Sequence, residues 1–342
     1  MNASRILHTF LSKTDTPAIK DKRRRNAVLT CVDALHKKPT LSLTTLGREI
    51  HTMAKQKHAI KRVCRLLGNA HLHRERPYVY QALCTHYLQG VTHPLIIIDW
   101  SPIGHADRQI LRAALPVGGR SITLYEEVHP ERRLASPQVH QRFLRQLHGL
   151  IPAHCIPIIC TDAGFKTPWF KQVESLGWFW LGRMRGVGHM YYQQSWVSCD
   201  SLFSQATHQP AALGSVVLTK AHQHTCYGVL YRKRPKGRQA KTWSGEKKQD
   251  TNSKKYEQNA REPWLLVSNL PQKDWPASRI VGLYSTRMHI EEGFRDTKST
   301  RYGLSLALCG SRDCARLEVL LMIAMLLHFV LMLVGRAAYL KG

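Results

Sequence analysis

The sequence predicts an α/β protein in which a mixed sheet with flanking helices follows a helical domain and is interrupted by a β-rich insertion. Strand-like and helix-like stretches alternate from residue 94 onward in the order β-β-β-α-β-α-β, which is typical of a sheet covered by helices. The stretch before residue 90 is helical and basic. The 342 residues, 43% of them apolar, are enough for two or three domains with cores.

The charge of the chain points to a polyanionic partner. Lys and Arg number 50 against 23 Asp and Glu, which gives a formal net charge of +27. Nucleic acid is the first candidate for such a basic protein. A membrane-surface binder is the alternative, but its basic residues would gather on one amphipathic helix, whereas here they are spread along the chain.

The nine cysteines are odd in number and form no Cys-x-x-Cys pair, which favours reduced thiols in a cytoplasmic protein. His222, His224 and Cys226 alternate as metal ligands on a strand can, but the usual zinc spacing is missing. Residues 1–20 contain no apolar core of signal-peptide length. We therefore expect a cytoplasmic protein.

Residues 1–90 are predicted to form a helical DNA-binding domain. Leu43, Leu46, Ile50 and Met53 recur at helical spacing. In the next segment, residues 56–67, an apolar face alternates with basic side chains, so this helix can lie along DNA phosphates. Its basic residues are Lys61, Arg62 and Arg65.

The first part of a core of strands and helices is predicted over residues 91–195. An apolar and mostly β-branched run over residues 95–98 ends in Asp99, as a buried central strand does when it delivers an acid at its carboxyl end. A second strand, residues 156–161, ends in Asp162. The further elements are a hairpin of residues 109–117 and 120–128, helices at 136–150 and 166–176, and a strand at 178–181.

The β-rich insertion is predicted over residues 196–276. Short strands at 214–219 and 227–231 precede a basic segment, residues 232–261, which is either an exposed cationic loop for DNA or a solvated linker. Strand pattern returns at residues 263–267, which include Trp264.

The second part of the core, residues 277–342, begins with a helix whose polar face carries both acid and base. On one continuous helix from Tyr284 to Lys298, a stripe about 60° wide holds four residues, and Glu292 is rotated by about 100° from Glu291, which lies in the stripe. The four are Tyr284, Arg287, Glu291 and Lys298. A solvated face with i, i+4 charge pairs is the alternative interpretation.

The apolar segment from Val319 to Val334 is predicted to be a buried core helix. It contains His328 and is shorter than the roughly 20 residues that a membrane-spanning helix needs.

Two strand-end carboxylates and one helical carboxylate supply hard oxygen ligands for two divalent ions. Asp99, Asp162 and Glu291 are therefore the predicted catalytic metal ligands. Mg²⁺ suits this ligand set, and we expect Mn²⁺ to substitute for it.

Three motifs of the chain resemble one known family. They are Ile-Ile-Ile-Asp-Trp ending at Trp100, Thr-Asp-Ala-Gly-Phe-Lys starting at Thr161, and Tyr-x-x-Arg-x-x-x-Glu-x-x-x-x-x-x-Lys from Tyr284 to Lys298. The chain is similar in these to the DDE transposases of bacterial insertion sequences that carry the Tyr-Arg-Glu-Lys signature. The likeness is greatest to the transposase of the insertion sequences that flank the tetracycline-resistance transposon, and it covers nearly all of the chain.

This resemblance implies an RNase H-like core and cut-and-paste transposition through a DNA hairpin. It implies that Asp99, Asp162 and Glu291 hold the metals, while Tyr284, Arg287 and Lys298 grip a phosphate near the cleaved end. Trp264 matches the family position whose indole stacks on a flipped base; an ordinary core strand residue is the equal alternative.

The implied partner is double-stranded DNA, both the terminal inverted repeats and the target, with a homodimer in the synaptic complex and no membrane. Family members usually continue for some tens of residues after the apolar helix, whereas this chain ends at Gly342. We therefore expect it to bind one DNA end and to pair two ends poorly. The alternatives are a truncated, inactive DNA-binding inhibitor of transposition and an unrelated RNase H-like nuclease.

Overall fold

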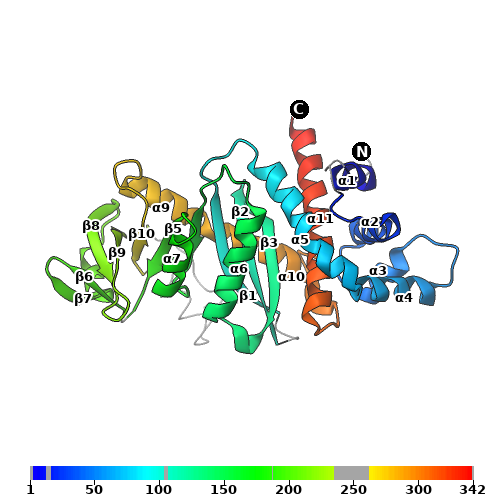
Figure 1. The fold of residues 1–342 in the computed structure, drawn as a ribbon, viewed down its shortest axis with the longest axis horizontal. Coiled ribbons are helices and arrows are strands. Elements are labelled where there is room, and N and C mark those ends of the chain that lie inside the picture. Colours follow the sequence, from blue (N-terminus) through cyan, green and yellow to red (C-terminus); the bar gives the residue numbers. More distant parts are fainter. Residues whose placement is uncertain (1–2, 13–16, 104–106, 187, 235–261, 341–342) are drawn as a thin grey trace, which may run out of the picture. The chain divides into compact units, whose positions relative to one another are not determined.

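The computed structural model describes residues 3–12, 17–103, 107–186, 188–234 and 262–340 (Figure 1). The chain divides into two compact units, unit 1 with Met1–Ile156 and Met288–Gly342, and unit 2 with Pro157–Arg287. Each unit is described by itself. Most of the predicted basic segment, residues 235–261, lies outside the described residues.

Unit 1 begins with the helices that the sequence predicts. They are α1 (Ala3–Ser12), α2 (Lys22–Lys37), α3 (Leu43–Glu49), α4 (Gln56–Leu67) and α5 (Ala70–Leu88). Gly47 lets α3 approach α4, because a Cβ at this position would lie 2.6 Å from the Cα of Ile60. The helical placement of Met53 is wrong, since α3 ends at Glu49 and Met53 is fully exposed beyond it.

The sheet of unit 1 has the order β3-β2-β1, with antiparallel neighbours. Its strands are β1 (Leu95–Ile103), β2 (Arg108–Val117) and β3 (Arg120–Pro130). The predicted hairpin is confirmed, and both of its turn glycines have positive φ, 52° at Gly118 and 80° at Gly119, as a tight hairpin turn requires.

The prediction that the first strand ends at Asp99 is wrong. β1 continues to Ile103 because its pairing with β2 continues, from Asp99 opposite Arg112 to Ile103 opposite Arg108. The apolar run stops at Ile98, but the strand does not, so Asp99 lies in the middle of β1.

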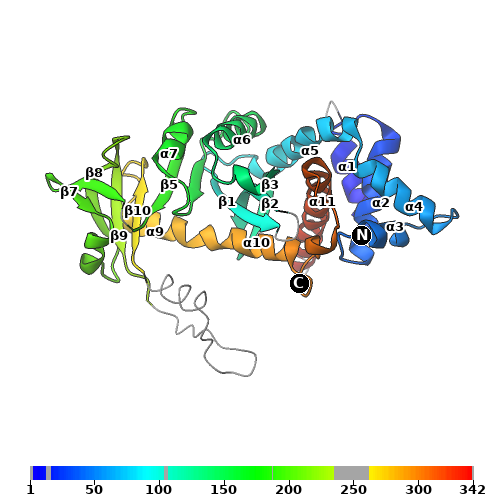
Figure 2. The ribbon, with the colours of Figure 1, turned by 90° about the horizontal axis from the view of Figure 1, so that it is seen from below.

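Helices cover both faces of this sheet. α6 (Pro137–Leu150) lies on one face and α10 (His289–Lys298) on the other (Figure 2). On the α6 side the rings of Phe143 and Tyr125 are 5.2 Å apart, and on the α10 side the Arg112 guanidinium lies 4.6 Å from the ring of Phe294. Short 3-10 helices, η1 (Glu131–Arg133) and η4 (Leu306–Leu308), precede α6 and α11.

The predicted apolar helix is α11 (Cys314–Tyr339), which packs against β3. By length and composition it could cross a membrane, and 67% of its most apolar window is buried inside the structure. Its buried residues extend from Leu317 to Val330, which agrees with the predicted core helix.

Unit 2 contains a mixed sheet of order β4-β5-β10-β9-β8-β6-β7. Only β4 and β5 are parallel among its described neighbours. The strands are β4 (Ile158–Thr161), β5 (Phe179–Met184), β6 (His189–Tyr192), β7 (Ser195–Ser198), β8 (Ala211–Leu218), β9 (His224–Tyr231) and β10 (Trp264–Ser268), with η2 (Asp200–Gln205) between β7 and β8. Together with unit 1, this sheet confirms the predicted mixed α/β class.

Two helices flank the sheet of unit 2 on opposite faces, α7 (Thr167–Glu174) and α9 (Ala277–Ser285) (Figure 2). On the α7 face, Phe170 stacks on Trp180 with ring centroids 4.3 Å apart. Gly182 makes room for this ring, because a Cβ there would lie 2.4 Å from the Cζ of Phe170.

The prediction of one continuous helix from Tyr284 to Lys298 is wrong. α9 ends at Ser285, a 3-10 turn η3 (Thr286–Met288) follows, and α10 begins at His289. Side-chain hydroxyls explain the break, since Ser285 donates to the carbonyl of Gly282 at 2.7 Å and Thr286 to that of Leu283 at 2.8 Å. Such bonds compete with the regular helical pattern.

Candidate active site

The side chain of Asp99 on β1 is oriented by the backbone of the next residue. Its side chain is half-buried, and its Oδ1 accepts a hydrogen bond from the backbone N–H of Trp100 at 2.8 Å. The indole of Trp100 in turn donates to Nε2 of His140 on α6 at 3.0 Å. The strand segment that carries the predicted catalytic acid is therefore anchored on the α6 face of the sheet.

Lys298, the last residue of α10, reaches β1 beside Asp99. Its Nζ donates to Oγ of Ser101 at 2.5 Å and to the carbonyl of Pro102 at 3.2 Å. Burial lowers the pKa of Lys298, Arg112 lowers it further, and Asp99 opposes the shift. The acid and the base therefore share one electrostatic environment within unit 1. The pattern of the sequence gave no signal for Ser101 as the partner of this lysine.

The two adjacent glutamates of α10 differ in their surroundings. Glu291 is exposed in the first turn, whereas Glu292 pairs with Arg120 at 3.3 Å and with Arg295 on its own helix. Gly293 lets α10 press onto β3, since a Cβ there would lie 2.4 Å from Oγ of Ser121. Glu292 is thus engaged in joining α10 to the β2–β3 hairpin.

Asp162 follows β4 directly, as predicted, and lies in unit 2. Its Oδ1 accepts a hydrogen bond from the backbone N–H of Gly164 at 2.8 Å. Gly164 keeps this turn tight, because a Cβ there would lie 2.9 Å from the same oxygen.

Tyr284 and Arg287 belong to the same unit as Asp162. Tyr284 is buried, and burial raises the pKa of its phenol; Arg287 and Arg183 oppose this shift, whereas Cys160 and Asp162 add to it. The phenol of Tyr284 therefore lies in the electrostatic field of Arg287, Arg183 and Asp162. The sequence gave no prediction for Arg183, which lies on β5 and donates to the carbonyl of Pro263 at 3.1 Å.

Trp264 begins β10 and is half-buried. Its ring meets Tyr284 edge-on at 5.0 Å and Tyr231 at 5.8 Å, and Nζ of Lys233 lies 5.3 Å from its centroid. An indole with aromatic neighbours and a cation beside it suits both interpretations of this position, a packed strand residue and a stacking platform for a base.

The predicted basic face of α4 is present. Lys61, Arg62 and Arg65 are exposed, while Val63 and Leu66 on the opposite side are buried. The helix therefore presents its cations to solvent, as phosphate contact requires.

The predicted metal ligands are divided between the units, with Asp99 and Glu291 in unit 1 and Asp162 in unit 2. Within the described residues, no group of three or more His, Cys, Asp or Glu side chains is gathered as a metal site. The donor chemistry fits a hard divalent cation, because all three are carboxylates and a backbone amide orients each of the two aspartates.

Comparison with known families defines the class of the protein. Residues 91–328 match the model of the family described as the transposase DDE domain. This match covers more than half of the chain, so the chain belongs to the transposase DDE domain family. No curated protein matches the chain. Transposases act on DNA, and those of the DDE class generally use divalent metal ions.

Proposed function

We propose that the chain is the cut-and-paste transposase of a bacterial insertion sequence and belongs to the group with the Tyr-Arg-Glu-Lys signature. The observation that carries this proposal is the position of Lys298, bonded to Ser101 on β1 and electrostatically coupled to Asp99. A lysine from the end of the signature thus lies next to the first acid of the DDE set, where a DNA phosphate would have to be held.

The three acids would hold two Mg²⁺ ions, with Mn²⁺ as a substitute. When bound, these ions supply charge stabilisation at the phosphate and lower the pKa of the attacking water. The protein's part is to present the carboxylates of Asp99, Asp162 and Glu291 in fixed orientations. Water would attack a phosphodiester at the element end, and the P–O3′ bond would break to free a 3′-hydroxyl. This hydroxyl would then attack a phosphodiester of the opposite strand, so that a new P–O bond forms while the P–O bond to the flanking DNA breaks, and the element end closes as a hairpin.

The cationic and aromatic residues would hold the DNA during these steps. Lys298, Arg287 and the phenol of Tyr284 would grip a phosphate near the cleaved end through charge-assisted hydrogen bonds. Trp264 would stack on the base that leaves the helix when the hairpin forms. Lys61, Arg62 and Arg65 on α4 would follow the backbone of the terminal repeat.

Synapsis of two DNA ends would need a homodimer in the bacterial nucleoid. The apolar residues of α11 from Leu317 to Val330 are already buried within unit 1. They are thus not available as a partner surface of the roughly 1,200–2,000 Å² that a stable dimer buries. We therefore expect single-end complexes to dominate in gel shifts of this chain.

Nicking of a labelled element end in Mg²⁺ tests the proposal against the alternative of an inactive DNA-binding inhibitor. The wild-type chain should nick, and Asp99→Asn, Asp162→Asn and Glu291→Gln should abolish nicking while gel-shift affinity stays nearly unchanged. Glu292→Gln is the matched control, because its carboxylate is engaged with Arg120. DNA binding without nicking by the wild type would favour the inhibitor, and equal loss in Glu291→Gln and Glu292→Gln would exclude the assigned role of Glu291.

A further inference from the structure

A row of charged residues with alternating sign crosses the sheet of unit 1 on one face. Asp99 on β1 lies opposite Arg112 on β2, and Arg112 lies opposite Glu126 on β3. Residues directly opposite each other in antiparallel strands project from the same face of the sheet. The predicted catalytic acid therefore stands at one end of a three-residue row, with Arg112 in the middle.

The other two members, Arg112 and Glu126, form a buried ion pair. Nη2 and Nε of Arg112 lie 2.7 and 2.8 Å from Oε2 of Glu126, and the two side chains are 4% and 0% exposed. The desolvation of two buried charges offsets most of their attraction, so such a pair contributes little net stability compared with apolar residues of similar size. The pair thus calls for an explanation other than stability.

Arg112 also contacts α10. Its guanidinium carbon lies 4.6 Å from the ring centroid of Phe294, and its Nη2 donates to Oγ1 of Thr297 at 3.3 Å. Thr297 immediately precedes Lys298, and Phe294 follows Glu291 by one helical turn. One side chain therefore connects the strand next to Asp99 with the part of α10 between Glu291 and Lys298.

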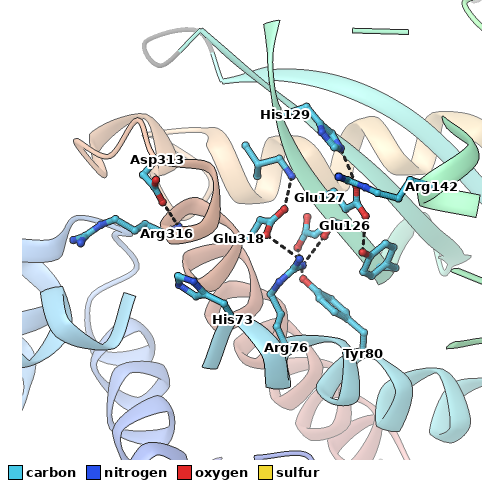
Figure 3. Close-up of polar contacts among 12 residues, drawn as sticks. His73, Arg76, Tyr80, Glu126, Glu127, His129, Arg142, Asp313, Arg316 and Glu318 are labelled. Atoms are coloured by element: carbon cyan, nitrogen blue, oxygen red, sulfur yellow. Dashed lines mark hydrogen bonds and ion pairs between the residues drawn. The ribbon is translucent and has the colours of Figure 1, made fainter. Parts of the chain in front are cut away.

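Glu126 is itself fixed from the helical side of unit 1 (Figure 3). Tyr80 on α5 donates to its Oε1 at 3.4 Å, and Arg76 on α5 donates to its backbone carbonyl at 2.8 Å. Arg76 is in turn paired with Glu318 on α11 at 2.8 Å. Glu126 is thus a rigid counter-ion for Arg112.

We propose that Arg112 is a positioning residue that holds α10 on the strand carrying Asp99. Glu126 neutralises the guanidinium and turns it toward α10. The catalytic importance of this arrangement rests on the proposed roles of Asp99, Glu291 and Lys298. The attachment of α10 by Arg112 does not depend on them.

Three variants separate positioning from simple stabilisation. They are Arg112→Lys, Arg112→Met and the double variant Arg112→Met/Glu126→Met, in which no buried charge is left unpaired. The matched control is Arg142→Met, which removes an arginine that pairs with the neighbouring Glu127 at 3.0 Å on the α6 face of β3.

The first measurement, amide hydrogen exchange followed by mass spectrometry, requires no activity. In the double variant, residues 289–298 of α10 should exchange about tenfold faster, while residues 137–150 of α6 keep their protection. The single-turnover nicking rate should fall by about 100-fold, as small misplacements of reacting groups can cause, with DNA affinity unchanged. Arg112→Lys should be intermediate, and Arg142→Met should match the wild type in both measurements.

A folded double variant with wild-type exchange in α10 would overturn the proposal, as would wild-type nicking by that variant. Loss of folding in all three Arg112 variants would also overturn it, because the pair would then be needed for folding itself. If the wild-type chain does not nick DNA, the proposed function fails, and the exchange of α10 still decides whether Arg112 holds this helix.

Discussion

Acidification should destabilise unit 1 through Glu127, a buried carboxylate on β3. Its side chain is 5% exposed, and it accepts hydrogen bonds from the phenol of Tyr125 at 2.7 Å and from Arg142 at 3.0 Å. Burial alone would raise the pKa of Glu127, but His129, Tyr125 and Arg142 outweigh it and hold the pKa at about 2, below the ordinary value of 4.5.

The magnitude follows from this shift. The difference between 4.5 and about 2 is 2.5 pKa units, which corresponds to about 3 kcal/mol of stability at 1.36 kcal/mol per unit. Because the folded-state pKa is depressed, the stabilisation is fully present above pH 4.5 and is lost as the pH falls toward 2. Between pH 5 and pH 3 about 2 kcal/mol of it should disappear.

Urea unfolding of the wild type and of Glu127→Gln, followed by circular dichroism at several pH values, measures the pH-dependent contribution of Glu127 to the unfolding free energy. The difference in unfolding free energy between the two proteins should shrink by about 2 kcal/mol from pH 5 to pH 3. Glu292→Gln is the control, since the exposed ion pairs of Glu292 should contribute less than about 1 kcal/mol throughout. A difference between wild type and Glu127→Gln that stays constant over this range would refute the reasoning.

Three further predictions concern DNA contacts and packing. Trp264→Ala should permit the first nick and raise the nick-to-hairpin ratio, because stacking worth about 1–3 kcal/mol is lost only when the strand distorts; a lowered melting temperature with an unchanged ratio would indicate a core role. Replacing Lys61, Arg62 and Arg65 together by alanine should reduce the slope of log K against log salt by about 2.7, that is about 0.9 per phosphate contact, and an unchanged slope in gel shifts would exclude these contacts. Gly182→Val should lower the melting temperature of unit 2, because the Cβ would meet the ring of Phe170, and an unchanged melting curve would contradict this packing.

The elements that sequence reasoning predicted correctly are those with a local cause. Two consecutive glycines between apolar strands predicted the β2–β3 hairpin, and both adopt the positive φ that a side chain disfavours. The helix α6 was equally clear, because its apolar residues recur at helical spacing and Phe143 and Leu147 are indeed buried.

The errors arose where a distant partner decides the structure. The length of β1 is set by its pairing with β2, so the apolar run alone placed the strand end too early, at Asp99. Similarly, Lys298 finds Ser101 far away in the sequence, and no spacing rule predicts this hydrogen bond. The sequence reasoning did not single out Arg112, because its ion pair with Glu126 depends on the register of the hairpin.

The predicted polar face of the signature segment is valid only where the segment is a single helix. Glu291 and Lys298 both lie on α10, seven residues apart, which is close to two turns, so they do project from similar angles. Glu292 is rotated by about 100° from Glu291 and turns to Arg120 instead. Tyr284 precedes the 3-10 turn and Arg287 lies within it. Both belong to unit 2, where they share an electrostatic environment with Asp162. The signature therefore describes two local environments that are adjacent in the sequence, one around Asp99 and one around Asp162, and a helical wheel can be applied only to the first.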